Sequence, residues 1–295
     1  MSGPRASIVV PAYNSAATIG RALESALAQT VGDWELIVAD DASADDTVAR
    51  VAAFEDARIT LVRAPRNGGP AAARNLALTR ASGDAIAFLD ADDWWQPAFL
   101  ERQLAALTDG VGIAACDARI ASPDGERFEA GTYYDQFRAV EPVTIERLLR
   151  RNVLFVSCVV PRAAGEEVGW FDEALFGTED HDLWIKILET GRSCAVTREP
   201  LAVYRRTAAS ISRNTARQAA NNQKTLRAAL ARGRLTPRQR RVARSELRYN
   251  RALQVVAGAA LDSRRPALRE LPEVAFIAAT RPRHWGEWLT ALRTR

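Results

Sequence analysis

The stretch AIAFLDADDWWQP, Ala85 to Pro97, joins a run of apolar residues to three acidic residues and two tryptophans. The run predicts a β-strand that continues into the acidic residues. Asp90, Asp92 and Asp93 repel one another when all are ionised, and such crowding is tolerated mainly where a cation or hydrogen-bond donors compensate it. The compensation has to come from elsewhere in the chain or from something bound.

The residues before this stretch alternate between strands and helices. Apolar runs at 6–13 and 34–43 predict strands, and apolar spacing of three and four after Ser15 predicts a helix. This alternation predicts a Rossmann-like α/β fold, with a mostly parallel, doubly wound sheet and helices on both faces. Ligands bind such sheets beyond the carboxyl ends of the strands. The rim there is expected to hold residues 11–14, 40–41, 67–69 and 90–93.

The rest of the chain extends this pattern and then changes character. Proline favours the first helical turn, so a helix is expected to begin near Pro70. The segment 122–137 is expected to form a hairpin or an irregular loop. Further helices are expected at about 44–54, 97–107, 144–152, 179–191, 215–232 and 237–261, and strands at 59–64 and 112–120.

Charge divides the chain into two parts after Tyr204. Residues 1–204 hold 19 basic and 31 acidic residues, a net charge of −12, whereas the remainder holds 21 and 5, a net charge of +16. We therefore expect a ligand-binding domain at 1–205 and a basic, mainly helical region at 206–295. The basic region, with Trp285 and Trp288 near its end, would suit peripheral contact with an anionic membrane. Docking onto the acidic part and self-association are the alternatives, and no nucleic-acid-binding motif accompanies the charge.

Composition limits the class of protein. No apolar run approaches the ~20 residues of a membrane-spanning helix, and the N-terminus lacks the apolar core of a secretory signal. We expect a cytoplasmic protein, with contact to the inner face of the membrane as an option. Cys116, Cys158 and Cys194 form no CxxC pair, which argues against a disulfide framework and a zinc site.

The acidic residues suit a hard divalent cation such as Mg²⁺ or Mn²⁺, which prefers carboxylate oxygens. If the strand continued through Asp90 and Asp92, their side chains would point to the same side. One carboxylate could then hold the metal while the other contacts a ribose. The alternative for Asp93 is a helix N-cap before WQPAFLERQL.

Five motifs in order resemble the inverting family 2 glycosyltransferases, which have a nucleotide-diphospho-sugar-binding fold of the A type. The resemblance covers about residues 6–205 and leaves the basic region outside. The matching motifs are SIVVPAYN (7–14), LIVADDAS (36–43), RNGGPAAARN (66–75), SGDAIAFLDADDWWQP (82–97) and FGTEDHDLWIKI (176–187).

The resemblance implies roles for residues on the donor side. Asp41 would accept a hydrogen bond from the base, and chemistry favours uracil or thymine because their imide N–H can donate to a carboxylate. Asp40 is the weaker candidate, with capping of the following turn as its other role. Arg74 would face the diphosphate, with a surface ion pair as its alternative. Asp90 would lie by the ribose and sugar, Asp92 would hold the metal, and the nucleoside would be bordered by Pro11, Ala12, Tyr13 and Asn14.

The resemblance assigns the catalytic base to Asp180, since an inverting transfer needs a group that removes the acceptor hydroxyl's proton. Glu179 would orient that base or the donor sugar. The alternative is a helix start, with Thr178 as N-cap and acidic residues in the first turn. His181 is a secondary candidate for substrate or metal, and a structural role is its alternative.

Aromatic residues near these motifs have two interpretations. Of Trp94 and Trp95, we expect one to be buried and one to line the sugar pocket. Trp184 shares helical spacing with Ile187 and Leu188, so a place in the core is expected.

Together these features predict a metal-dependent inverting glycosyltransferase that moves a sugar from a UDP or dTDP donor to a saccharide or lipid-linked acceptor, in polysaccharide or glycolipid assembly of a bacterial envelope. A nucleotidyltransferase is one alternative, but it would leave Asp180 without a task. A non-catalytic nucleotide-sugar-binding membrane scaffold is the other. A Rossmann dehydrogenase is disfavoured because PAYNSAATIG lacks the glycine-rich phosphate fingerprint.

Overall fold

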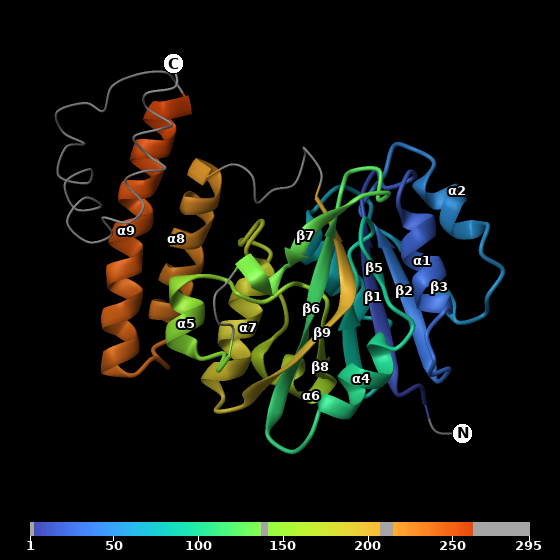
Figure 1. The fold of residues 1–295 in the computed structure, drawn as a ribbon, viewed down its shortest axis with the longest axis horizontal. Coiled ribbons are helices and arrows are strands. Elements are labelled where there is room, and N and C mark those ends of the chain that lie inside the picture. The colour runs from blue at the N-terminus through green and yellow to red at the C-terminus, as the bar shows by residue number, and fades with distance from the viewer. Residues whose placement is uncertain (1–2, 137–140, 207–214, 262–295) are drawn as a thin grey trace. The chain divides into compact units, whose positions relative to one another are not determined.

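The computed structural model describes residues 3–136, 141–206 and 215–261 (Figure 1). The chain divides into two compact units, Met1–Ala208 and Ala209–Arg295. The first unit holds the five motifs quoted above. Trp285 and Trp288 lie outside the described residues.

The first unit is built on one sheet with the strand order β3-β2-β1-β4-β8-β6-β9-β5, and β7 pairs with β6. The first four strands of this order are parallel, and the central members, β1 and β4, are buried along almost their whole length because helices cover them. These strands are β1 (Ala6–Ala12), β2 (Trp34–Asp40), β3 (Ile59–Arg63) and β4 (Ala85–Phe88).

The sheet beyond β4 is mixed. The strands are β5 (Trp94–Trp95), β6 (Val111–Ala121), β7 (Phe128–Thr132), β8 (Cys158–Pro161) and β9 (Ser193–Arg205). β8 runs antiparallel to both β4 and β6, β5 antiparallel to β9, and only β6 and β9 pair in parallel. The segment 122–137, for which a hairpin or an irregular loop was expected, contributes β7, which pairs antiparallel with β6 outside that segment. The short β8 therefore separates the parallel strands from the mixed part of the sheet.

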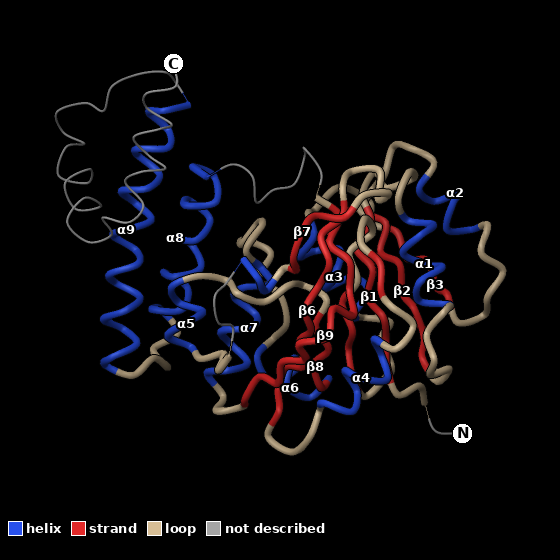
Figure 2. Tube along the Cα trace, in the orientation of Figure 1, coloured by secondary structure: helices blue, strands red, loops and turns tan. Residues whose placement is uncertain are grey.

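Helices pack against this sheet, as Figure 2 shows, and the predicted α/β fold class is confirmed. α3 packs on β1 and β2, α4 on β6 and β9, and α7 on β6 and the short α5. The helices are α1 (Ile19–Leu27), α2 (Thr47–Ala52), α3 (Pro70–Leu78), α4 (Phe99–Ala106), α5 (Ile145–Arg150), α6 (Arg162–Val168) and α7 (Glu179–Glu189), with a 3₁₀ turn, η1, at Tyr134–Gln136. Pro70 is the first residue of α3, as predicted.

The fourth strand ends earlier than its sequence indicates. β4 stops at Phe88, and the Asp93 N–H donates to the Asp90 carbonyl at 3.1 Å, which folds the acidic residues into a turn. The expectation that Asp90 and Asp92 continue the strand is therefore wrong. Their proximity comes from the turn and not from the alternation of a strand.

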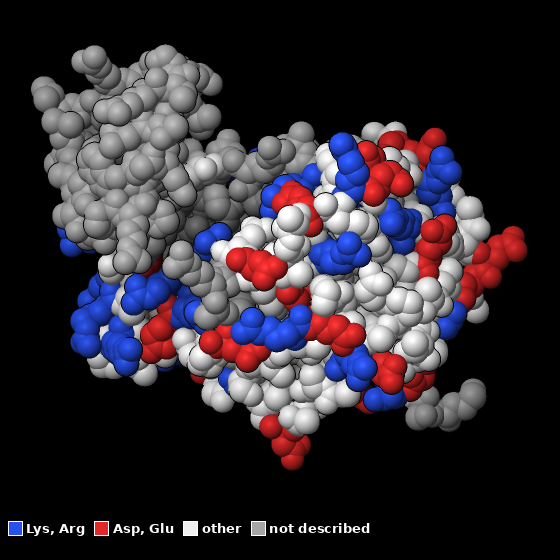
Figure 3. Space-filling model, in the orientation of Figure 1, with Lys and Arg blue, Asp and Glu red and all other residues white. Residues whose placement is uncertain are grey.

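In the second unit, the structure describes residues 215–261, which form two helices, α8 (Thr215–Ala231) and α9 (Pro237–Leu261), at nearly the predicted bounds. They pair through polar side chains: Asn222 donates to Asn250 at 3.2 Å and Gln223 to Gln254 at 2.8 Å. Where these helices are visible in Figure 3, most charged side chains are basic, whereas both signs mix over the first unit. Within the described residues, neither these helices nor any other has the length and hydropathy to cross a membrane.

Candidate active site

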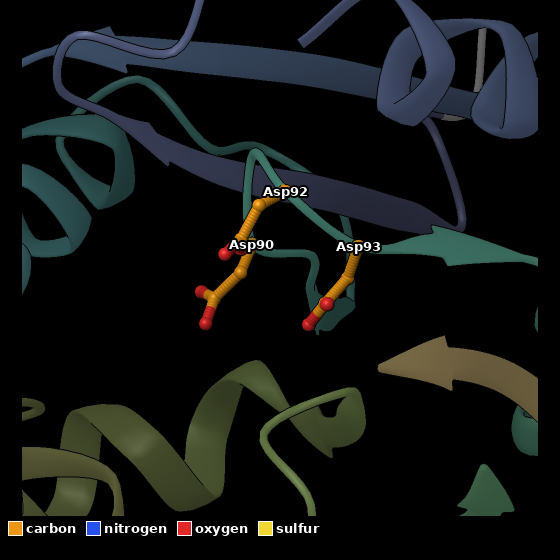
Figure 4. Close-up of side chains that lie close together, drawn as sticks. All are labelled: Asp90, Asp92 and Asp93. Atoms are coloured by element: carbon orange, nitrogen blue, oxygen red, sulfur yellow. The ribbon is translucent and has the colours of Figure 1, made fainter. Parts of the chain in front are cut away.

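Three carboxylates gather in the turn after β4. Asp90, Asp92 and Asp93 each offer an oxygen, and these oxygens lie within 4.8 Å of one another (Figure 4). Asp90 and Asp92 are partly exposed, whereas Asp93 is buried and its Oδ1 accepts the Arg205 N–H at 2.8 Å. The helix that follows begins only at Phe99, so the N-cap role considered for Asp93 is wrong. Asp93 instead ties the turn to β9.

The protein compensates this negative charge only in part. Arg74 pairs with Asp90 at 2.6 Å, but the Arg205 guanidinium donates to the backbone carbonyl of Asp92 and not to its carboxylate. Burial, and then the charge of Asp90, raise the pKa of Asp92 to about 6. Burial and both neighbours raise the pKa of Asp93 well above its usual range. Two adjacent carboxylates with raised pKa values, Asp92 and Asp93, fit a hard divalent cation, which would supply the missing positive charge.

Arg74 lies inside the molecule, with only 3% of its surface exposed. Its Nη2 donates to Asp90 Oδ1 at 2.6 Å and its Nη1 to Glu179 Oε1 at 2.7 Å. The surface ion pair considered for Arg74 is therefore wrong, because both pairs are largely shielded from water. Although burial opposes it, the charges of Asp90 and Glu179 raise the pKa of Arg74, so the guanidinium stays protonated.

Asp180 lies in the first turn of α7, beside Glu179. Its Oδ1 accepts the His181 N–H at 2.7 Å, and its Oδ2 accepts from Asn152 Nδ2 at 3.1 Å. Burial raises the pKa of Asp180, and the charge of Arg74 opposes that rise. α7 begins as the helix-start alternative predicts, with Thr178 at the N-cap position and Glu179, Asp180 and Asp182 in the first turn, although the Thr178 side chain makes no capping hydrogen bond. Asp180 is a half-buried carboxylate held at two points.

Asn152 is a site residue that the sequence analysis missed. It comes after α5, and its Oδ1 accepts the Leu154 N–H at 3.2 Å while its amide nitrogen holds Asp180. Its position in RRN carries no motif, and its distance of 28 residues from Asp180 leaves no spacing to detect. Only the packing of α5 against α7 brings the two together.

His181 faces another part of the fold. It is buried, its Nε2 lies 2.7 Å from the Leu148 carbonyl of α5, and burial lowers its pKa. A neutral imidazole can donate this bond, which links α7 to α5. The contact favours the structural alternative for His181.

Asp41, after β2, is satisfied by the backbone. Its two carboxylate oxygens accept the N–H groups of Gly68 and Gly69, each at 2.8 Å, and the side chain is buried. Gly69 has φ of 86°, and a Cβ there would lie 3.1 Å from the Phe176 ring, so this turn requires glycine. Asp40 accepts the Ser43 N–H at 3.3 Å and so caps the following turn, which is the alternative role considered for it.

The end of β1 forms the neighbouring part of the rim. The Ala12 carbonyl accepts the Asp41 N–H at 2.8 Å, and Tyr13 follows with 51% of its surface exposed. Asn14 has φ of 47°, and its side chain accepts the Ala44 N–H at 2.8 Å. Residues 11–14 and Asp41 are therefore adjacent, and the Tyr13 ring is open to a ligand.

Both tryptophans after the acidic turn are buried, so the expectation that one lines a pocket is wrong. Trp94 packs with Ala121 and Val203, and the Arg21 guanidinium lies 3.7 Å from the centre of its ring. Trp95 stacks on Phe99, and its Nε1 donates to the Ser157 hydroxyl at 3.1 Å. The core position of Trp184 is confirmed, and the three cysteines form no disulfide.

The fold and this arrangement define a class of enzyme: glycosyltransferases of the A-type fold. Residues 7–159 match the family described as Glycosyl transferase family 2, and the chain belongs to that family.

Curated relatives are similar over about two thirds of the chain. The succinoglycan biosynthesis protein ExoO of Rhizobium meliloti (strain 1021) is 39% identical over 211 residues, which make up 68% of this chain and 60% of that protein. A UDP-Glc:α-D-GlcNAc-diphosphoundecaprenol β-1,3-glucosyltransferase of Escherichia coli, WfgD, is 33% identical over 210 residues, or 70% of this chain and 79% of that protein. The chain thus spans less than two thirds of the first relative and more than two thirds of the second.

Solved structures share the fold. The mannosyltransferase PcManGT of Pyrobaculum calidifontis, in complex with GDP-Man and Mn²⁺, superposes with a TM-score of 0.69 at 22% identity, covering 99% of this chain and 86% of that one. S. aureus TarS 1-349 in complex with UDP-GlcNAc gives a TM-score of 0.69 at 20% identity, covering 98% and 81%. At these identities the likeness concerns the fold.

Proposed function

We propose that this protein is a metal-dependent, inverting hexosyltransferase that moves a sugar from a nucleotide diphosphate to an acceptor hydroxyl in polysaccharide or glycolipid assembly. One observation carries most weight: Arg74 bonds both Asp90, in the acidic turn after β4, and Glu179, the neighbour of Asp180. A cation site and a candidate base thus belong to one site. A nucleotidyltransferase would not need the second of these groups.

The nucleoside would lie at the rim between β1 and β2. Pro11, Ala12, Tyr13 and Asn14 would border it, and Asp41 would accept the imide N–H of uracil. Each Asp41 oxygen accepts one glycine N–H and keeps a further lone pair for this bond. UDP-Glc in the name of the E. coli relative and UDP-GlcNAc in the TarS complex agree with uracil, although PcManGT was solved with GDP-Man.

The acidic turn would hold the metal and the donor sugar. Asp92 is the proposed ligand of Mg²⁺ or Mn²⁺, with Asp93 beside it, and Asp90 would contact the ribose and sugar. When bound, the cation would neutralise charge on the leaving diphosphate. Mn²⁺ in the PcManGT complex is consistent with this choice of metal.

Asp180 would be the base. As the acceptor oxygen bonds to the anomeric carbon, opposite the departing diphosphate, its proton would pass to a carboxylate oxygen of Asp180. Asn152 and the His181 N–H hold this carboxylate in one orientation. The raised pKa makes Asp180 a stronger base than a solvated aspartate.

The acceptor would be a saccharide or a lipid-linked sugar, as the diphosphoundecaprenol in the name of the E. coli relative suggests. The basic region 206–295 would bring the enzyme to an anionic membrane surface. In its described part, 215–261, eleven basic residues face a single acidic one, Glu246, which is buried. Each basic residue near such a surface contributes about 1 kcal/mol to binding.

A panel of nucleotide sugars tests the proposal. Release of nucleoside diphosphate is followed with Mn²⁺ or Mg²⁺ for wild type, Asp92→Ala and Asp180→Asn. Wild type should hydrolyse one donor slowly without acceptor, and both variants should lose that activity, Asp180→Asn while still binding the nucleotide. Donor binding without turnover, even after addition of envelope lipid, would instead indicate a scaffold.

A further inference from the structure

Arg74 joins two segments that are far apart in the chain. Asp90 follows β4, Glu179 opens α7, and they lie 16 and 105 residues from Arg74 on α3. The ion pairs of 2.6 and 2.7 Å are made by different terminal nitrogens of one guanidinium. Through these two bonds, the turn that carries Asp92 is tied to the helix that carries Asp180.

The guanidinium is covered on the side of the site. The Arg74 side chain is 4% exposed, whereas the Asp90 side chain that it bonds is 30% exposed. The Asp90 side chain is therefore more accessible to a ligand than the guanidinium that it bonds. The Phe171 ring lies 5.4 Å from the guanidinium carbon, and the buried Arg74 Nε makes no hydrogen bond.

This geometry is unsuited to a bidentate phosphate contact. Such a contact uses two N–H groups along one edge of the guanidinium fork. Each terminal nitrogen of Arg74 already donates to a carboxylate, the side chain is only 4% exposed and Nε is buried, so a phosphate has little access to the N–H groups that remain. The planar fork does suit two carboxylates in fixed directions, a task that the single ammonium of lysine performs poorly.

We propose that Arg74 is a positioning residue that holds Asp90 and Glu179 at a fixed separation, and so aligns the donor side of the site with Asp180, instead of binding the diphosphate. This inference rests on the proposed function, because it concerns the same site. It assigns a role to Glu179, whose carboxylate anchors Arg74 from α7, the helix that carries Asp180.

The test separates binding from turnover in Arg74→Gln and Glu179→Gln. UDP affinity is measured by calorimetry with Mn²⁺, and hydrolysis is measured for the donor that wild type cleaves. For Arg74→Gln we expect the Kd of UDP to change by less than about threefold and hydrolysis to fall at least about 100-fold, as for a lost transition-state alignment. For Glu179→Gln we expect the same pattern with a loss of about tenfold, because the glutamine oxygen still accepts from Arg74.

A diphosphate ligand would behave differently. If Arg74→Gln weakens UDP binding by about tenfold or more while Glu179→Gln changes neither quantity, the inference is wrong. Arg192→Gln is the matched control: Arg192 pairs with Glu167 at 2.6 Å, outside the site, and its loss should leave Kd and hydrolysis unchanged.

Arg74→Gln leaves Glu179 buried without a counter-ion and can fail to fold, so the double variant Arg74→Gln/Glu179→Gln is made as well. It should bind UDP like wild type and hydrolyse the donor as slowly as Arg74→Gln. Wild-type hydrolysis by the double variant overturns the inference. If wild type itself binds no nucleotide, the proposed function fails. In that case the ion pair is tested by a double-mutant cycle of unfolding free energies for Arg74→Gln and Glu179→Gln. Additive effects of the two changes would show that the side chains do not interact and would overturn the inference.

Discussion

Two groups of aspartates lie on the same rim of the sheet but differ in how their negative charge is compensated. At the end of β2, both carboxylate oxygens of Asp41 accept backbone N–H groups, and Asp40 caps a turn. After β4, the three carboxylates face one another, and Asp92 has its pKa raised to about 6. The first group is satisfied by the protein, whereas the second lacks positive charge.

The difference separates carboxylates whose charge is stabilised by backbone N–H groups from carboxylates that need a cation. Both groups follow a buried parallel strand and look alike in sequence as DD pairs. Hydrogen-bond donors distinguish them: the Gly68–Gly69 turn supplies two for Asp41, whereas the Asp92 carboxylate has its own backbone N–H, with the charges of Arg205 and Arg74 as further compensation. We therefore expect changes at Asp41 to act on folding and, through the lost bond to the base, on donor binding, and changes after β4 to act mainly on turnover.

The largest effect is expected for Asp92→Ala. Donor hydrolysis should fall about a thousandfold, since a metal that stabilises the leaving group contributes several kcal/mol to the transition state. Thermal unfolding in EDTA should show no loss of stability, because the change removes a like charge from the turn. If this variant kept more than about a tenth of wild-type turnover, the contrast drawn between the two groups of aspartates would be wrong.

Asp41→Ala, unlike Asp92→Ala, should lose folding stability. It leaves two turn N–H groups without acceptors, and each such loss costs about 1–3 kcal/mol. Urea unfolding measures the change, and Asp41→Asn, which keeps one acceptor oxygen, should lose less. An unchanged stability in Asp41→Ala would show that the turn is held by other contacts.

The pH dependence of stability should distinguish the two groups further. Because the folded pKa of Asp92 is raised from 3.8 to about 6, the native state holds its proton more tightly than the unfolded chain. Stability from this group is complete below the unfolded pKa and is lost as pH rises through about 6. In EDTA, wild type should therefore lose stability relative to Asp92→Asn between about pH 4 and pH 7. A parallel pH dependence of the two proteins would contradict the raised pKa.

The smallest effect is expected for Arg63→Gln. Arg63 pairs with Asp40 at 3.5 Å, but its side chain is 60% exposed, and such pairs contribute less than about 1 kcal/mol. Stability should fall within that limit and donor hydrolysis should stay constant. A large loss of turnover would mean that the rim after β2 contributes to the chemistry.

The sequence predicted the elements better than their connections. Apolar runs and Pro70 located the parallel strands and α3, because burial on both faces dictates composition directly. The early end of β4 was not predicted, because AIAFLD is apolar enough for a longer strand. The turn is apparent only from the backbone hydrogen bond between Asp93 and Asp90. The antiparallel β8 escaped as well, because strand direction depends on pairing partners that no local pattern records.

For the site, motifs predicted which residues gather but not what each one contacts. Arg74 was expected to face a ligand, yet its partners Asp90 and Glu179 are side chains of the protein. Asn152 had no signal, because an asparagine after a helix is common and its bond to Asp180 depends on tertiary packing. The tryptophans were misjudged because burial against β9 and α4 cannot be read from two adjacent aromatic residues.

The most direct test of the central claim, that the crowded carboxylates after β4 hold a divalent cation for the donor, is a calorimetric titration of UDP with and without Mn²⁺. Wild type should bind UDP at least about tenfold more tightly with the metal, and Asp92→Ala should show no such difference. Equal affinity of wild type in the presence and absence of Mn²⁺, or the same gain in Asp92→Ala, would contradict the account.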